Sequence, residues 1–206
     1  SFFLLSFIFT TVTVQAQVAQ WGTNGAATSN LPSGLTSGVI KVRSNFGSYS
    51  AIKSDGTVVV WGESSRGGNA SSVSSLTSVQ EIYPLGVNAG DKLQRCFVAK
   101  KNDGTIYSWG DTVRGALLSS LTGNNVIAHI AINYYSAIAI DVNGVFYGTG
   151  EYGNVISTNY SDANNVHYTD LSNITKISGN AGSYTAIRSD GSVLNWGHWA
   201  KNLSTV

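Results

Sequence analysis

The sequence predicts an all-β protein built as a β-propeller-like array of about four short-repeat blades. Three observations predict it. A hairpin motif recurs along the chain, its copies return after 40 to 48 residues, and no stretch shows apolar residues at helical spacing. Periods in this range are typical of arrays in which each unit buries its faces against its neighbours. Short strands joined by Gly-rich turns favour a propeller among such arrays.

The first copy of the motif is SYSAIKSDGTVVVWG, Ser48–Gly62. Asp55-Gly56 stands between two runs of alternating, β-favouring residues, and Asp-Gly suits a two-residue hairpin turn with positive φ at both positions. The motif therefore predicts a β-hairpin. Three further copies have the same plan: FVAKKNDGTIYSWG (Phe97–Gly110), AIAIDVNGVFYGTG (Ala137–Gly150) and YTAIRSDGSVLNWG (Tyr184–Gly197).

Comparison of the copies indicates which positions face a core. Four residues before the turn Asp or Asn each copy has an alanine, which predicts close approach of neighbouring sheets: Ala51, Ala99, Ala139 and Ala186. Two residues before it the copies are mostly charged, which predicts exposure to solvent: Lys53, Lys101, Asp141 and Arg188. The outgoing strand ends in a residue that is followed by glycine: Trp61, Trp109, Thr149 and Trp196. These tryptophans are predicted to be shared core, because such rings bury a large area.

The chain opens with an apolar segment. Ser1–Thr10 is almost wholly apolar, and Val14-Gln15-Ala16 fits the small-residue cleavage pattern of a secretory signal peptide. The segment is shorter than the about 20 apolar residues that a membrane-spanning helix needs. Residues 1–16 are therefore interpreted as a signal-peptide remnant or as a retained β-prone segment that adds a strand to another copy. Residues 17–206 form the repeat domain, with units near 21–60, 61–108, 109–148 and 149–195 and a partial unit at 196–206.

Composition favours an extracellular or cell-surface protein. Charged residues make up 11% of the chain, against about 25% in a typical domain. The net charge is +1, and no basic stripe exists to neutralise phosphates, so nucleic acid is not expected as a partner. Cys96 is the single cysteine and cannot form an internal disulfide, so it is interpreted as a small buried hydrophobe.

Two segments depart from the repeat plan. Extra residues at Asn88–Arg95 precede the second hairpin, and a long polar loop follows Gly150. Both leave from the face opposite the Asp-Gly turns, because the incoming strand of each hairpin begins there. Departures from a repeat plan tend to collect where function sits, although neutral drift in loop length is the alternative. The loop supplies four candidate contact residues: Tyr152, Tyr160, His167 and Tyr168.

The end of the chain supplies one more candidate. Trp199 lies in WGHWAKN but outside the repeat core, so it is interpreted as an exposed anchor or as the cap on a sheet edge.

A search for catalytic and metal-binding motifs predicts none. The three histidines, His129, His167 and His198, have no partner at metal-ligand spacing, and His129 is expected to face a loop. No nucleophile elbow, phosphate loop or zinc signature is present, and the Asp-Gly pairs lack the neighbouring carboxylates of a calcium loop. The sequence therefore predicts no enzyme, no catalytic residue, no cofactor and no metal. Four Asn-x-Ser/Thr sequons are candidate N-glycosylation sites: Asn69, Asn159, Asn173 and Asn202.

The segment AIKSDGTVVVWG at Ala51–Gly62, followed by a GG pair, resembles the regulator-of-chromosome-condensation repeat family. Blades of that family are built on an Ala-x-Lys-x-Asp-Gly-x-Val-x-x-Trp-Gly core, and the resemblance covers about Val18 to Trp199. It implies a propeller but no single function, since this fold serves a nuclear exchange factor, a plant ultraviolet photoreceptor and a secreted β-lactamase inhibitor. With its short repeats and its features of a secreted protein, the chain is more similar to the bacterial inhibitor and to surface repeat proteins than to the nuclear factor. Propellers of the family usually close with about seven blades, whereas this chain has about four.

The shortfall in blades leads to two hypotheses of function. An unclosed arc leaves sheet edges ready to pair, and a head-to-tail contact that does not close gives a filament. The first hypothesis is a non-catalytic extracellular structural or adhesive protein that self-associates through sheet-edge contacts into a surface filament or layer. The alternative is a soluble secreted propeller that binds a protein or glycan ligand on its non-turn face. A fragment of a longer array, copies that complete one another and a closed ring of four blades all stay open.

Overall fold

The protein is represented by a computed structural model that describes residues 31–87, 94–111, 122–132, 136–150, 173–180 and 183–197. These residues form four three-stranded antiparallel sheets, which we call blades 1 to 4. Blade 1 contains β1 (Val39–Ser44), β2 (Ser48–Lys53) and β3 (Val58–Gly62), and blade 2 contains β4 (Val79–Val87), β5 (Gln94–Lys101) and β6 (Ile106–Gly110). Blade 3 contains β7 (Ile127–Ile132), β8 (Ser136–Asp141) and β9 (Phe146–Gly150), and blade 4 contains β10 (Ile174–Gly179), β11 (Ser183–Arg188) and β12 (Val193–Gly197).

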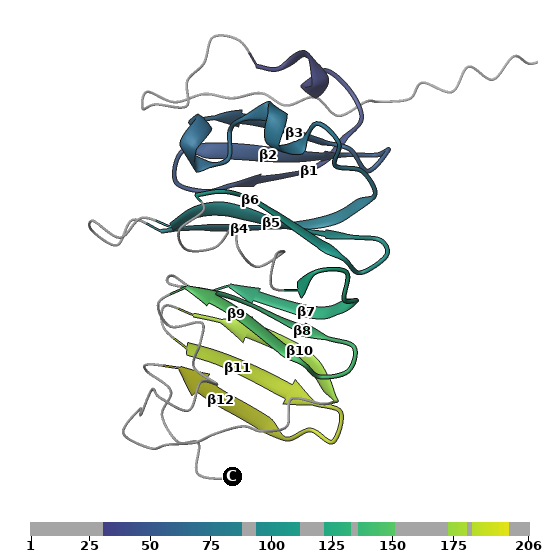
Figure 1. Cartoon of the computed structure of the whole chain (residues 1–206), viewed down its shortest axis with the longest axis vertical. Coiled ribbons are helices and arrows are strands. Elements are labelled where there is room, and N and C mark those ends of the chain that lie inside the picture. Colours follow the sequence, from purple (N-terminus) through teal and green to yellow (C-terminus); the bar gives the residue numbers. More distant parts are fainter. Residues whose placement is uncertain are drawn as a thin grey trace, which may run out of the picture.

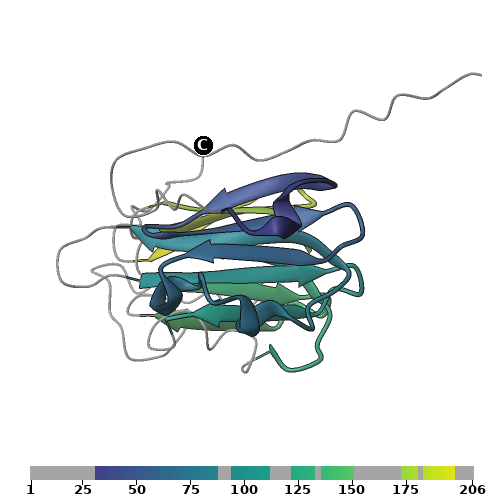
Figure 2. The ribbon, with the colours of Figure 1, turned by 90° about the horizontal axis from the view of Figure 1, so that it is seen from above.

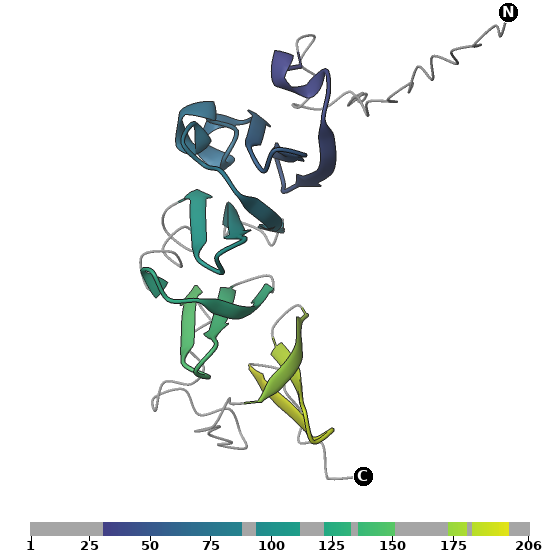
Figure 3. The same cartoon turned by 90° about the vertical axis from the view of Figure 1, so that its right-hand side faces the viewer.

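The predicted all-β architecture is confirmed, because the described residues are built around the four sheets, beside which lie three short 3-10 turns: η1 (Ser33–Leu35), η2 (Ser64–Arg66) and η3 (Ala70–Val73). The blades follow one another along the long axis of the molecule (Figure 1). Seen from above, their strands overlie one another (Figure 2), and seen from the side the blades follow a curve (Figure 3). Blades 1 and 4 lie at opposite ends of it. The four described blades therefore form an open arc. They do not form the closed ring of four blades that was one of the possibilities from the sequence.

The hairpin turns differ from the sequence prediction in their geometry. Gly56 N–H donates to the Lys53 carbonyl (2.9 Å), and Lys53 N–H donates to the Thr57 carbonyl (2.9 Å). Gly56 has a φ of 78°, whereas Asp55 is not among the described residues with positive φ. The expected two-residue turn is therefore wrong, and the hairpin has a three-residue turn with a G1 bulge at glycine. The same pair of bonds recurs in the other blades, with glycines at φ of 83°, 82° and 84°: Gly104, Gly144 and Gly191.

A side-chain bond explains why the turn takes this form. Asp55 Oδ1 accepts hydrogen bonds from the Thr57 hydroxyl (2.6 Å) and from Thr57 N–H (2.9 Å). These two bonds also lower the pKa of Asp55 below its usual value. The aspartate therefore bridges across the glycine to Thr57, the residue just before β3, in an Asx-type contact.

Blade 3 fixes its turn from a different position. Asn143 replaces the aspartate, and Asp141 Oδ1 accepts from Asn143 N–H (2.8 Å) and Val145 N–H (2.9 Å). Asp141 is buried, so the predicted exposure of this position is wrong there. The reason is that its carboxylate satisfies two backbone donors. The equivalent residues of the other blades, Lys53, Lys101 and Arg188, are partly exposed.

The blades stack face to face, and the predicted core residues lie between them. Each blade has a leading face toward the preceding blade and a trailing face toward the next. In blade 2 the leading face carries Ala99 and Trp109, which share a core with Ile52 and Val60 on the trailing face of blade 1. The predicted burial is confirmed for four alanines and three tryptophans: Ala51, Ala99, Ala139, Ala186, Trp61, Trp109 and Trp196. The side chain of Thr149 lies outside the described part.

Polar contacts also cross the seams, the lines along which successive blades meet. Val79 N–H of blade 2 donates to the Gly56 carbonyl of blade 1 (3.0 Å), and Ile127 N–H of blade 3 donates to the Gly104 carbonyl of blade 2 (2.8 Å). In the second of these seams Lys100 Nζ also donates to the Ala128 carbonyl of blade 3 (3.0 Å). Each of these two seams therefore pairs backbone groups at the turn side of the sheets.

A salt-bridge cluster adds to the first seam. Glu81 of blade 2 forms ion pairs with Lys41 and with Arg43 (2.8 Å) of blade 1. Burial opposes the ionised carboxylate, but the hydrogen bonds from Lys41 and Ile82 N–H and the charge of Arg43 outweigh it and lower the pKa of Glu81. The pair is half-buried, so it is screened less than a surface pair.

A β-bulge at the second residue of the first strand recurs in every blade. The residue after the bulge, the third of the strand, has a polar side chain in every blade. These side chains are Lys41, Glu81, His129 and Lys176, opposite Ile52, Lys100, Ile140 and Ile187. Sequence comparison of the hairpins alone could not find this position, because it lies in the strand before the hairpin.

Other sequence predictions can be placed on the structure. The β-favouring run that precedes each hairpin also forms a strand: residues 39–43, 79–86, 126–132 and 174–178 correspond to β1, β4, β7 and β10. Of the extra residues at 88–95, Gln94 and Arg95 belong to β5, and 88–93 lie outside the described residues. Cys96 is buried as predicted, and its burial raises the pKa of the thiol. Residues 1–30, with the predicted leader, also lie outside the description. In the described part, no helix is long and apolar enough to cross a membrane.

The buried tryptophans give the first testable prediction. Replacing Trp61 with alanine is expected to lower the free energy of unfolding by about 3–5 kcal/mol, because the ring is buried and stacked on Tyr49 (ring centroids 5.2 Å apart). Urea unfolding followed by circular dichroism measures the change. Phe46→Ala, at an aromatic that is exposed, serves as the control and is expected to cost about 1 kcal/mol or less. Equal losses in both variants would mean that Trp61 is not core.

A pair of turn glycines tests the stacking itself. Gly56→Ala and Gly191→Ala both force alanine into a left-handed conformation, which costs about 1–2 kcal/mol. A Cβ at Gly56 would also lie 3.0 Å from backbone atoms of Ser78, the residue just before β4 of blade 2, whereas a Cβ at Gly191 meets nothing within 4 Å. Gly56→Ala should therefore destabilise the protein by at least about 1 kcal/mol more in urea unfolding. Equal losses would show that blades 1 and 2 do not meet at this turn.

Candidate interaction site

Most of the residues singled out from the sequence lie outside the described part of the chain. This holds for five candidate contact residues and two sequons: Tyr152, Tyr160, His167, Tyr168, Trp199, Asn159 and Asn202. Asn69 and Asn173 are described, and both are exposed. Asn69 Oδ1 accepts from Ser71 N–H (3.1 Å) and caps η3. Asn173 has a φ of 57° and immediately precedes β10. Glycosylation of either asparagine stays a prediction.

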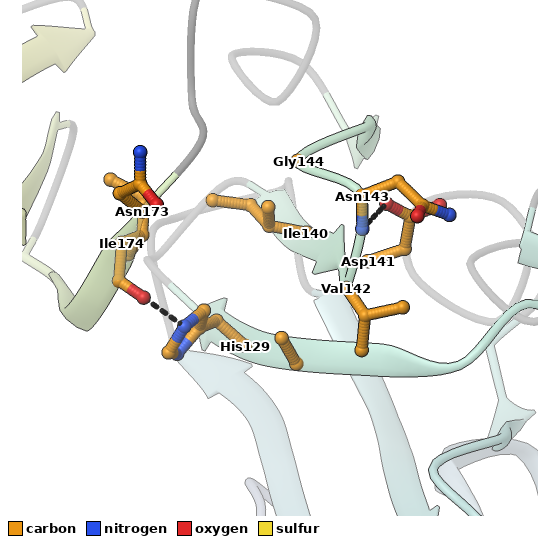
Figure 4. A pocket seen from close by; sticks show the side chains of 9 residues that line it. His129, Ile140, Asp141, Val142, Asn143, Gly144, Asn173 and Ile174 are labelled. Atoms are coloured by element: carbon orange, nitrogen blue, oxygen red, sulfur yellow. Dashed lines mark hydrogen bonds between the residues drawn. The ribbon is translucent and has the colours of Figure 1, made fainter.

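His129 has a different role from the one expected. Its Nε2 lies 2.7 Å from the Ile174 carbonyl, the first residue of β10 (Figure 4). The ring therefore links blade 3 to blade 4 and does not face a loop, because the bulge in β7 turns it toward the next blade. Within the described ranges, no group of three or more His, Cys, Asp or Glu is placed to hold a metal ion.

A pocket of about 240 Å³ opens beside His129, in the seam between blades 3 and 4. Figure 4 shows Asn173 and Ile174 of blade 4 on one side of it and Asn143 and Gly144 of the blade 3 turn on the other. Ile140 lies between them. The walls are thus partly aliphatic, and the rim carries two carboxamides.

This pocket replaces a contact that the other two seams contain. Blades 1 and 2, and blades 2 and 3, are joined by a bond from the first strand to the carbonyl of the turn glycine. At the third seam the equivalent groups are Ile174 N–H and the Gly144 carbonyl, and no bond joins this pair although both residues are described. Both residues line the pocket instead. Between its described residues, the third seam is therefore open on the turn side.

Val142 lines this pocket, and two further exposed valines, Val126 and Val145, belong to the same turn region of blade 3. Val142 N–H donates to the Val126 carbonyl (3.0 Å), which brings the two side by side, and Val145 lies in the same turn. Their exposed fractions are 63%, 45% and 48%. We call these residues the valine cluster. The equivalent positions of the other blades hold glycine or polar residues: Gly38, Ser54 and Thr57; Ser78, Asn102 and Thr105; Asn173, Ser189 and Ser192.

The trailing face of blade 4 is a second uncovered surface. Ile187 and Val193 are 39% and 48% exposed, whereas their counterparts in blade 1, Ile52 and Val58, are 1% and 9% exposed. Lys176 is exposed at the position of Lys41. Blade 4 thus presents a lysine, an isoleucine and a valine at the positions where blade 1 ion-pairs the lysine with blade 2 and buries the other two.

The leading face of blade 1, by contrast, is covered by the chain itself. Leu35 of η1 shares a core with Val39, Ala51 and Trp61, and Leu31 packs against that core. The segment before β1 therefore occupies the place that a preceding blade would take.

Comparison with known proteins supports the fold. Neither the known protein-family models nor the curated protein sequences match this chain. Among solved structures, the chain is similar to the CRINKLY WD40 ectodomain of the Arabidopsis thaliana receptor kinase ACR4, with 12% identity and a TM-score of 0.52 over 77% of this chain and 50% of that one. It is also similar to Prp20p of Saccharomyces cerevisiae, with 15% identity and a TM-score of 0.52 over 77% of this chain and 45% of that one.

A third match is yeast RCC1 (Prp20) bound to Kap60, with 15% identity and a TM-score of 0.50. This chain spans about half the length of these proteins or slightly less. At such low identity the likeness concerns the fold alone. The repeated hairpin, the stacked three-stranded sheets and these matches together show that the chain has the fold of the RCC1-like β-propeller proteins.

Proposed function

We propose that this protein is a non-catalytic structural or adhesive module, extracellular or at the cell surface, that associates with other copies through its uncovered sheet surfaces. The single observation that carries the proposal is the exposed trailing face of blade 4, where Ile187 and Val193 are 39% and 48% exposed. Covering such side chains stabilises an assembly by about 1.5–3 kcal/mol for each residue that becomes fully buried.

The chemistry of this face supports association with another sheet. Lys176, Ile187 and Val193 occupy the positions of Lys41, Ile52 and Val58. In blade 1 that set is covered by a whole blade. The same set in blade 4 is therefore suited to a sheet of another chain, with a carboxylate near Lys176. A filament or layer results where the contact repeats without closing.

A non-catalytic role is supported by what the acidic residues do. The protein has 11 of them, few for its size. Three aspartates, Asp55, Asp103 and Asp190, hold hairpin turns through bonds to the second residue after each. Asp141 holds the hairpin turn of blade 3, and Glu81 forms ion pairs across the first seam. These carboxylates are used by the fold. The extracellular location rests on the apolar opening segment and on the low charge content.

The alternative is a soluble secreted propeller that binds a protein or glycan on its non-turn face. One observation favours it: β4 and β5 have nine and eight residues, whereas β1, β2, β7 and β8 have six each. Their hairpin connection lies at the end opposite the Asp-Gly turns, so blade 2 extends further on that face. Prp20p, a protein of the same fold, was analysed for binding to Gsp1p and histones, which agrees with a binding role for such scaffolds.

Size-exclusion chromatography with light scattering tests the proposal. The protein is expected to form dimers or larger species as its concentration rises, and electron microscopy is expected to show regular assemblies. The double variant Ile187→Lys, Val193→Lys should shift the protein to the monomer, because two charges on each face oppose its burial.

Val145→Lys is the matched control, since Val145 and Val193 are equally exposed valines on different surfaces. This variant should associate as the unchanged protein does. A monodisperse monomer at every concentration would contradict self-association and leave the binding propeller. Equal effects of the lysine substitutions on both surfaces would show that any added charge, and not the blade 4 face, controls association.

A further inference from the structure

We propose that the valine cluster and the adjoining seam pocket form a binding site for an extended polypeptide segment that carries a β-branched or similarly small aliphatic side chain. This site lies on the turn side of blades 3 and 4 and is separate from the trailing face of blade 4. It goes beyond the proposed assembly, because a single chain can use it whether or not copies associate.

The other two seams indicate what fits in this position. In the first seam, the nearest atoms to a Cβ built on Gly56 are backbone atoms of Ser78 and Val79. In the second, a Cβ built on Gly104 meets Val126 and the nitrogen of Ile127. A polypeptide backbone therefore packs on the turn glycine in both closed seams, and in the second seam it carries the β-branched side chain of Val126. The third seam is open, and the same kind of segment suits it.

Backbone groups give the site its polarity. Gly144 and Ile174 both line the pocket, and the bond that joins their counterparts is not formed between them. A segment in extended conformation offers both an N–H and a C=O along one edge, as in peptide recognition by strand addition. Such a segment can bond to the Gly144 carbonyl and to Ile174 N–H at the same time. Asn143 at the rim adds a carboxamide that can pair with a peptide group.

Apolar contact supplies the affinity. The fold does not require valine at the three positions of the cluster, because blades 1, 2 and 4 build the same turn with glycine or polar residues there. Val142 lines the pocket directly, next to Ile140 and Ile174. Covering exposed aliphatic surface is worth about 25 cal/mol per Å². A small aliphatic side chain of the ligand can therefore enter the pocket while the ligand backbone covers the valine cluster.

The carboxylate of Asp141, which lines the pocket, is already hydrogen-bonded within its own turn, and this favours a neutral ligand. Asp141 is buried, and its Oδ1 already accepts two backbone N–H groups of its own turn. His129 Nε2 is engaged with the Ile174 carbonyl. The neutral peptide unit, and not an ion, is thus the chemistry that the pocket matches.

Selection from a phage-displayed library of linear peptides tests the site, with the full chain as target and counter-selection on the Val142→Lys variant. Enriched peptides are expected to share an aliphatic residue. Fluorescence anisotropy with a synthesised peptide should show at least about tenfold weaker binding to Val142→Lys. Binding to Val193→Lys, the same substitution on the trailing face of blade 4, should stay unchanged. Failure to enrich any peptide over the Val142→Lys background, or equal binding to both variants, would overturn the proposal.

Amide hydrogen exchange gives an independent readout. In the free protein Ile174 N–H should exchange faster than Val79 N–H and Ile127 N–H, its bonded counterparts, and the selected peptide should slow it. Slow exchange of Ile174 in the free protein would overturn the proposal, since the seam would then be closed. Association of copies through blade 4 is measured separately, so failure of either idea leaves the other standing.

Discussion

The structure depends on the packing of one blade's leading face against the trailing face of the blade before it. A three-stranded sheet this short cannot bury enough apolar area alone, so each blade relies on its neighbours. Alanine in the middle strand lets the sheets approach, and an aromatic residue stacked on the tryptophan of the outer strand fills the remaining space. In blade 2 these residues are Ala99, Phe97 and Trp109, which share one core with blade 1. The residues that recur in the sequence motif are therefore those that form the contact between blades.

Much of this could be predicted from the sequence, because packing constraints act alike on every copy. The hairpins, the buried alanines and tryptophans and the strand before each hairpin followed from residue type and spacing. The turn geometry did not, since Asp-Gly suits both two- and three-residue turns, and the bond that Thr57 N–H donates to Asp55 Oδ1 is seen only in the folded turn. Asp141 was wrongly predicted to be exposed. Its carboxylate accepts hydrogen bonds from two backbone N–H groups that come close to it only in the folded turn.

The candidate site was harder to find, because it is defined by a missing contact and not by a motif. Valine at position 142 is unremarkable in a β-rich sequence. It becomes informative only when the folded turn sets it beside Val126, and when the equivalent residues of the other blades prove to be polar. The open seam itself depends on where Gly144 and Ile174 lie, which no single-sequence pattern encodes. The valine at position 142 and the seam without the backbone bond both lie at blades 3 and 4, toward one end of the arc (Figure 3).

Energetic coupling across a seam is the most direct test of this account. Ile52 on the trailing face of blade 1 and Phe97 on the leading face of blade 2 belong to one buried core. A double-mutant cycle of Ile52→Val and Phe97→Leu, measured by urea unfolding, is predicted to give an interaction energy of about 0.5–3 kcal/mol. Strictly additive changes in the free energy of unfolding would contradict the account, because they would mean that the two blades do not bury each other.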